Sequence, residues 1–284
     1  MMHKDIHRKL PDNVLLLDQV AEHEWTFKFP RLTSEVVEQF HKAIELWEEG
    51  DTAQAEQRYR QLIRAYPEFI DVYHHLAMLL DEAQRYDEAS QLWQQAVQLG
   101  LSVFPQSFSI GQDLLPWYFL DNRPFLRAYH GQGVDLFEWR EIESALSIFT
   151  NILALNPNDN QGIRELAINC YFHLKRPWDV LEISQHYPND MMAGVIYGRA
   201  LALYQQGRKA DAELALSDAI DSLPLVAKEL TKNQHRRPSK FYTDSITVGG
   251  ADEAYHYWLD YGKYWKKTPG AIDFVRNLLQ NQAQ

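Results

Sequence analysis

The fold of this chain is decided by residues 70–97, which read IDVYHHLAMLLDEAQRYDEASQLWQQAV. In the first half, apolar residues recur at the spacing of one stripe on an α-helix. These residues are Tyr73, Leu76, Ala77 and Leu80. A polar turn at 84–87 follows, and the second stripe is made by Ala89, Leu92, Trp93 and Ala96. The stretch therefore predicts two helices joined by a short turn.

The same motif recurs along the chain. It stands 34 positions earlier at Ala43, Leu46, Ala55 and Tyr59. After an insertion it returns twice, first at Tyr129, Gly133, Leu136, Ala145, Phe149 and Pro157, then at Ala200, Leu203, Ala212, Leu216, Ala219 and Pro224. A period of this length is typical of helix–turn–helix units that stack into a solenoid, because one unit cannot bury its apolar face alone. The pattern predicts one continuous helical body.

This spacing resembles the tetratricopeptide repeat, whose pattern is an aromatic residue, Leu-Gly or Leu-Ala and Tyr, later followed by Ala, an aromatic residue and Pro. The units are 36–69, 70–103, 126–159 and 193–225, with a degenerate unit at 160–188 whose turn holds Pro177. The resemblance implies an all-α, right-handed solenoid of about five repeats over 35–225, with capping segments at both ends.

Three shorter strings resemble a narrower group of tetratricopeptide proteins, those related to suppressors of tumorigenicity. They are Leu-Pro-Trp at 115–117, DNRPFLRA at 121–128 and NPNDNQGIR at 156–164. This resemblance implies a scaffolding protein and adds no catalytic residue.

Three segments lie outside the period. Residues 1–34 are predicted to be an extended lead-in and cap, and the aromatic insertion 104–125 is predicted to pack on the array, because so much apolar surface is costly to solvate. In 226–284 we expect a polar loop and two helices, at about 252–266 and 270–280. An aromatic stripe on the first of them is either a cap or a partner-binding surface: Tyr255, Trp258, Tyr261, Tyr264 and Trp265.

Composition narrows the class of function. The chain has 284 residues, of which 45% are hydrophobic and 24% charged, and its net charge of −11 disfavours binding to nucleic acid or to an anionic membrane. No stretch approaches the length of a membrane span or a signal peptide, so a cytoplasmic location is expected. The single cysteine, Cys170, excludes an intramolecular disulfide and is predicted to be buried.

Residue patterns that support catalysis or metal binding are weak. His23-Glu24 has no second histidine four residues on, and His74-His75 are adjacent and so point to different faces of their helix. Gly131-Gln132-Gly133 lacks a preceding strand and a third glycine. We therefore expect no enzyme activity, no catalytic residue, no metal and no cofactor.

The tetratricopeptide resemblance implies that the first helix of each repeat lines a groove for a peptide. The implied peptide-binding residues are Phe40, Ile44, Trp47, His74, Met78, Arg127, His130, Val134, Arg164, Ile168, Tyr171, Tyr197 and Leu201. The ninth helix position is aliphatic in every repeat, where many family members carry Asn. The carboxylate clamp of chaperone-tail receptors is therefore not expected.

Two occupants of such an apolar groove remain open. It binds an apolar or helical segment of another protein, or the protein fills it with its own insertion or termini and has a structural role in which homo-oligomers are possible. Arg127, His130 and Arg164 would form a cationic spot in the groove, either to hold a partner carboxylate or to pair with Asp159 or Glu165.

Overall fold

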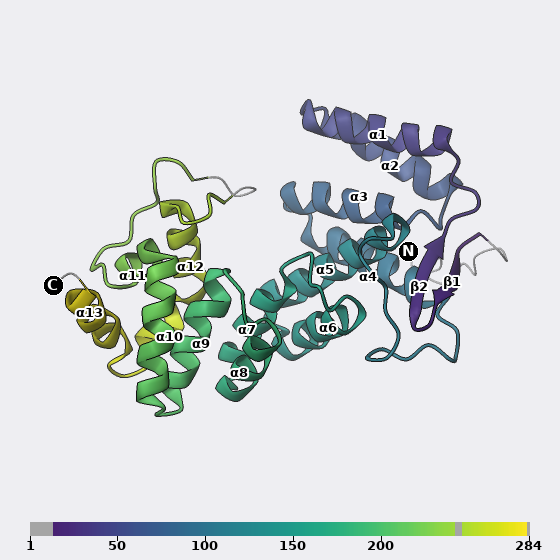
Figure 1. The fold of residues 1–284 in the computed structure, drawn as a ribbon. Helices are drawn as coiled ribbons and strands as arrows, with labels where there is room; N and C mark the ends of the chain where they lie inside the picture. The colour runs from purple at the N-terminus through teal and green to yellow at the C-terminus, as the bar shows by residue number, and fades with distance from the viewer. Residues whose placement is uncertain (1–13, 242–245, 283–284) are drawn as a thin grey trace. The chain divides into compact units, whose positions relative to one another are not determined.

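The computed structural model describes residues 14–241 and 246–282. In these ranges the protein is mostly helical, which confirms the predicted fold class, and one β-hairpin is added near the N-terminus. The chain divides between Ile163 and Arg164 into two compact units, coloured purple to teal and teal to yellow in Figure 1. The solenoid predicted as one body is therefore described as unit 1 and unit 2, each by itself.

The hairpin begins unit 1, within the segment 1–34 that the sequence predicts to be an extended lead-in and cap. Strands β1 (Leu16–Ala21) and β2 (Glu24–Lys28) pair antiparallel, with Leu17 opposite Phe27. The turn between them places His23 in the left-handed region at φ 60°. Phe27 is fully buried, so the hairpin belongs to the core of unit 1. Residues 1–13 of the predicted cap lie outside the described residues.

Three helix pairs follow in unit 1, and they match the predicted repeats 36–69, 70–103 and 126–159. The pairs are α1 (Ser34–Glu48) with α2 (Thr52–Ala65), α3 (Ile70–Glu82) with α4 (Tyr86–Leu101), and α5 (Arg123–Glu138) with α6 (Ile142–Leu155). The Thr33 hydroxyl accepts a hydrogen bond from the Val36 amide and caps α1. Gly50 adopts φ 86° in the first turn, a conformation that glycine reaches without strain.

The insertion 104–125 packs on unit 1, as the sequence predicts. The ring of Phe104 lies 6.2 Å from Phe27 and 5.7 Å from Phe125, measured between ring centroids. Asn122, in the short helix η1 (Leu120–Asn122), accepts from the Phe27 amide and donates to the Trp25 carbonyl. The insertion therefore joins the hairpin to the first turn of α5.

Unit 2 contains two further helix pairs and three C-terminal helices. The pairs are α7 (Ile163–His173) with α8 (Pro177–His186) and α9 (Ala193–Gln205) with α10 (Lys209–Ser222). The short α8 fits the degenerate repeat, which Pro177 begins in its first turn. After α11 (Pro224–Leu230), which the sequence did not predict, come α12 (Ala251–Lys267) and α13 (Ala271–Gln282), close to their predicted bounds.

Candidate partner-binding surfaces

In unit 1, two of the predicted peptide-binding residues are buried in the core, which corrects their assignment. Phe40 is 4% exposed, and its ring lies 5.1 Å from Phe69 and 4.9 Å from His75. His74 accepts a hydrogen bond from the indole of Trp93, at 3.2 Å. Burial holds the pKa of His74 well below its usual range, so the neutral ring that accepts this bond is favoured. Both side chains pack inside unit 1 and are not available to a partner.

The other aliphatic and aromatic positions predicted in unit 1 are exposed or partly buried. Met78 is 38% exposed and Val134 36%, while Ile44 and Trp47 are partly buried. These four residues stand on the first helices of three successive pairs, and α3 packs on both α1 and α5. We call Ile44, Trp47, Met78 and Val134 the α1–α3–α5 surface. Their binding role stays a prediction.

The predicted cationic spot does not form. Arg127 donates to Asp71 at 2.6 Å, so its charge is matched within unit 1. Burial lowers the pKa of His130, which favours its neutral ring. Arg164 belongs to unit 2, where it pairs with the buried Asp190. The two arginines thus pair inside the fold, with Asp71 and Asp190 among their partners.

Carboxylates that the sequence analysis did not select lie beside the α1–α3–α5 surface. Burial raises the pKa of Asp81 and of Asp135, and the charge of Asp81 raises the pKa of Asp135 further. Asp135 accepts hydrogen bonds from Ser90 and from the indole of Trp139, at 2.7 and 3.2 Å. The only sequence signal for them was Asp81 at the twelfth position of its helix, where other repeats carry aromatic residues.

In unit 2, the corresponding helix faces are covered by the chain itself. Ile168, Tyr197 and Leu201 are fully buried in one core with residues of α12. The ring of Tyr197 lies 5.5 Å from that of Tyr257, and the hydroxyl of Tyr264 donates to the Asn169 side chain at 2.6 Å. These residues therefore cannot line an open groove, which corrects their predicted role.

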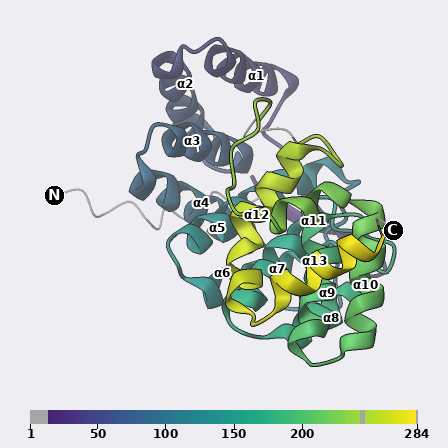
Figure 2. The same ribbon diagram turned by 90° about the vertical axis from the view of Figure 1, so that its left-hand side faces the viewer.

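Further contacts of α12 are also made within unit 2. Helix α12 lies against α9 and α11 (Figure 2). Trp265 is fully buried and donates from its indole to the Tyr257 hydroxyl at 2.8 Å. Tyr171, the last predicted binding residue, is partly buried, and the Arg176 guanidinium lies 5.1 Å from the centre of its ring. The aromatic stripe of α12 is directed into unit 2.

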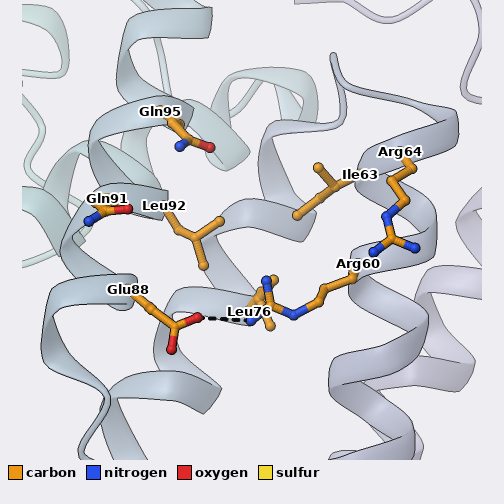
Figure 3. Close-up of a pocket in the computed structure, with 8 residues that line it drawn as sticks. All are labelled: Arg60, Ile63, Arg64, Leu76, Glu88, Gln91, Leu92 and Gln95. Atoms are coloured by element: carbon orange, nitrogen blue, oxygen red, sulfur yellow. Dashed lines mark hydrogen bonds and ion pairs between the residues drawn. The ribbon is translucent and has the colours of Figure 1, made fainter. Parts of the chain in front are cut away.

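Two hollows lie elsewhere in unit 1. The larger has a volume of about 650 Å³ and apolar walls from the hairpin, α1 and the start of α3, with Asp18, Lys28, Asp71 and Asp121 among its lining residues. The smaller, of about 250 Å³, lies between α2 and α4; Figure 3 shows Ile63 and Leu92 pointing toward one another across it. Arg60 at its edge is paired with Glu56 and Glu88. The positive charge of Arg60 is therefore already balanced by carboxylates of the protein itself.

Among residues 14–241 and 246–282, no three His, Cys, Asp or Glu side chains gather as a metal site would require. Within the same ranges, the helices lack the length and apolar character needed to traverse a lipid bilayer. Cys170 is buried, and burial raises the pKa of its thiol to about 12.

Comparison with known proteins supports the repeat architecture. Residues 25–268 match the model of a family described as transcriptional repressor TCF25. The narrower resemblance to suppressor-of-tumorigenicity-related proteins receives no support from this match. No curated protein sequence matches the chain.

Solved structures are similar in fold. A tetratricopeptide repeat protein from Parabacteroides merdae is 13% identical with a TM-score of 0.52, and the match covers 88% of each chain. The MamA protein is 15% identical with a TM-score of 0.50, over 72% of this chain and 98% of MamA. At such identities these matches show a tetratricopeptide-like fold and nothing more.

Proposed function

The chain belongs to the family of the transcriptional repressor TCF25, and on that premise we propose that it is a protein-interaction scaffold that binds a peptide or helical segment of another protein. The site is the α1–α3–α5 surface of unit 1. No catalytic step and no cofactor are part of this proposal. If the chain acts as a repressor, as the family description says, we propose that its protein partners contact the DNA. The net charge of −11 disfavours direct binding of this chain to DNA.

One observation carries the proposal. Met78 and Val134 are exposed on neighbouring helices of a repeat array, although their counterparts in unit 2 are buried. The insertion, which could have covered them, packs on the hairpin and on the first turn of α5 instead. Apolar side chains grouped on helices in this way suit a partner helix that lays its own apolar face against them.

Self-assembly is the second candidate function, and unit 2 gives a specific reason to keep it. There the protein already covers an equivalent face with its own helix α12. A second copy could supply a helix to the α1–α3–α5 surface in the same manner, and the experiment below separates this case from a different partner.

The experiment is site-specific photo-crosslinking in native cell extract. A photoreactive phenylalanine analogue replaces Met78, and a control protein carries it at Leu259, which is 53% exposed on α12. We expect the Met78 position to crosslink a protein that the Leu259 position does not, and Val134→Glu to abolish that product. A product made of two copies of this chain would establish self-assembly. Identical products at the two positions would contradict a specific site.

A further inference from the structure

The three helices of the α1–α3–α5 surface all end in acidic residues. Their last turns contain Glu45 and Glu48, Asp81 and Glu82, and Asp135 and Glu138, and none of them contains a basic residue. Carboxylates are unfavourable there, because the C-terminal end of a helix carries partial negative charge. Local rules that are broken in this way concentrate at functional sites.

These helix ends adjoin one another in unit 1. The indole of Trp47 on α1 donates to Glu82 on α3 at 3.1 Å. Asp81 on α3 is close enough to Asp135 on α5 for its charge to disfavour ionisation of that carboxyl group. The acidic ends therefore form one border, which runs beside Met78 and Val134.

No cation of the described residues neutralises this border. The nearest arginines along the chain stand in the turns after α3 and α5. Arg85 is held by Glu56 and Glu88, at 2.8 and 2.7 Å. Arg140 makes no ion pair with Asp81 or Asp135 among the described residues. Among the described residues, Asp135 is half-buried and Asp81 is exposed, and neither makes an ion pair with a basic side chain.

We infer that the α1–α3–α5 surface binds a basic amphipathic segment of a partner protein. Apolar side chains of that segment contact Met78 and Val134, and one of its Lys or Arg side chains contacts Asp81 and Asp135. This inference rests on the proposed function and specifies the partner. Arginine suits the site best, because its planar fork can donate to two carboxylate oxygens at once. The partner charge is opposite to the one predicted from Arg127, His130 and Arg164.

The test is selection of displayed random peptides of about 16 residues, long enough for a helix of roughly 24 Å. The full chain is compared with two variants: Asp81→Asn with Asp135→Asn, and Met78→Glu with Val134→Glu. The matched control is Glu213→Gln with Asp218→Asn, which removes the same charge from exposed positions of α10. Helical content and melting temperature are measured for every variant.

For the wild type and the control, we expect selected peptides to be enriched in Lys and Arg beside apolar residues. The best of them should bind the Asp81→Asn, Asp135→Asn variant about tenfold more weakly, which corresponds to one partly buried charge pair. The Met78→Glu, Val134→Glu variant should select none of them.

Other results would overturn the inference in distinguishable ways. Selected peptides without an excess of basic residues, still dependent on Met78 and Val134, would reject the charge preference and leave the proposed function standing. Failure to select any peptide above the empty support would reject both. A dimer in light scattering that Met78→Glu, Val134→Glu dissociates would assign the surface to a second copy.

Discussion

Unit 1 and unit 2 present the same helix position in opposite states. The ninth residue of the repeat unit is Met78 or Val134 in two repeats of unit 1, where it is exposed, and Ile168 or Leu201 in unit 2, where it is fully buried. In the first repeat of unit 1 it is Ile44, which is partly buried. The residues are equally apolar, and in unit 2 they belong to one buried core that includes side chains of α12. An apolar stripe in a repeat array therefore predicts that another segment covers it. It does not show whether that segment belongs to the same chain or to a partner.

The largest expected effect tests whether Arg164 belongs to the fold of unit 2 or to a partner site. The Arg164 side chain is 16% exposed and pairs with Asp190, which is 3% exposed. Arg164→Glu should destabilise unit 2 by about 5 kcal/mol, because it leaves two like charges in a buried position. Thermal unfolding measures the loss, and Arg199→Glu on the exposed side of α9 is the control. An unchanged melting temperature would contradict a structural role of Arg164 and would favour a role in partner binding.

The second prediction concerns a substitution that weakens the packing of α12 on unit 2. Trp265 is fully buried, and Trp265→Ala should cost about 3–4 kcal/mol, because it leaves a large cavity between α12 and the rest of unit 2. Trp178→Ala is the matched control, since Trp178 is 61% exposed. Hydrogen exchange should show α7 and α9 losing protection in the Trp265 variant alone. Equal effects of the two substitutions would mean that α12 is not an integral cover.

The third prediction concerns pH. Burial raises the pKa of Glu165 from its ordinary 4.5 to about 7, and the carboxyl group accepts from the Gly194 amide. The pKa of Glu165 is higher in the folded than in the unfolded protein. Its contribution to the free energy of unfolding is therefore fully present below pH 4.5 and is lost as the pH rises through 7. The loss should be about 1–2 kcal/mol for this partly exposed residue, and Glu165→Gln should remove it. Denaturant unfolding of both proteins at several pH values measures the difference; parallel curves would contradict it.

The smallest expected change in stability belongs to the open face of unit 1. Met78→Glu and Val134→Glu should each shift the free energy of unfolding by no more than about 0.5 kcal/mol, because both residues are already exposed. Leu201→Glu, at the equivalent but buried position of unit 2, is the contrast and should clearly lower the melting temperature, because it buries a charge. Comparable melting temperatures for Val134→Glu and Leu201→Glu would break the comparison between the units.

The sequence predicted what depends on local periodicity. The repeat units agree with the helix pairs from α1 to α10, and the insertion packs where its aromatic residues find apolar neighbours. The hairpin was missed, because β2 holds three consecutive buried residues, Trp25, Thr26 and Phe27, and so lacks the alternation that marks a half-buried strand.

The candidate site was predicted less well than the fold. Helix position grouped Met78 and Val134 as binding residues, which stays a prediction, but it could not show that Ile168 and Leu201 are buried in the core of unit 2. The sequence left open whether Arg127 and Arg164 hold a partner carboxylate or pair within the fold, and it could not identify Asp71 and Asp190, which are distant in sequence, as their partners. Tertiary contacts decide which side chains stay available, and spacing along one helix carries no information about them.

The covalent connection of α12 to the rest of unit 2 also determines how tightly a free segment must bind to displace it. Because α12 follows α11 on the same chain, its contact with unit 2 is intramolecular and acts as though the helix were present at an effective concentration in the millimolar range. A free segment at micromolar concentration would have to bind that face roughly a thousandfold more tightly than α12 does to displace it. Unit 1 has no such tethered competitor on its α1–α3–α5 surface among the described residues, so even a weak ligand could occupy it.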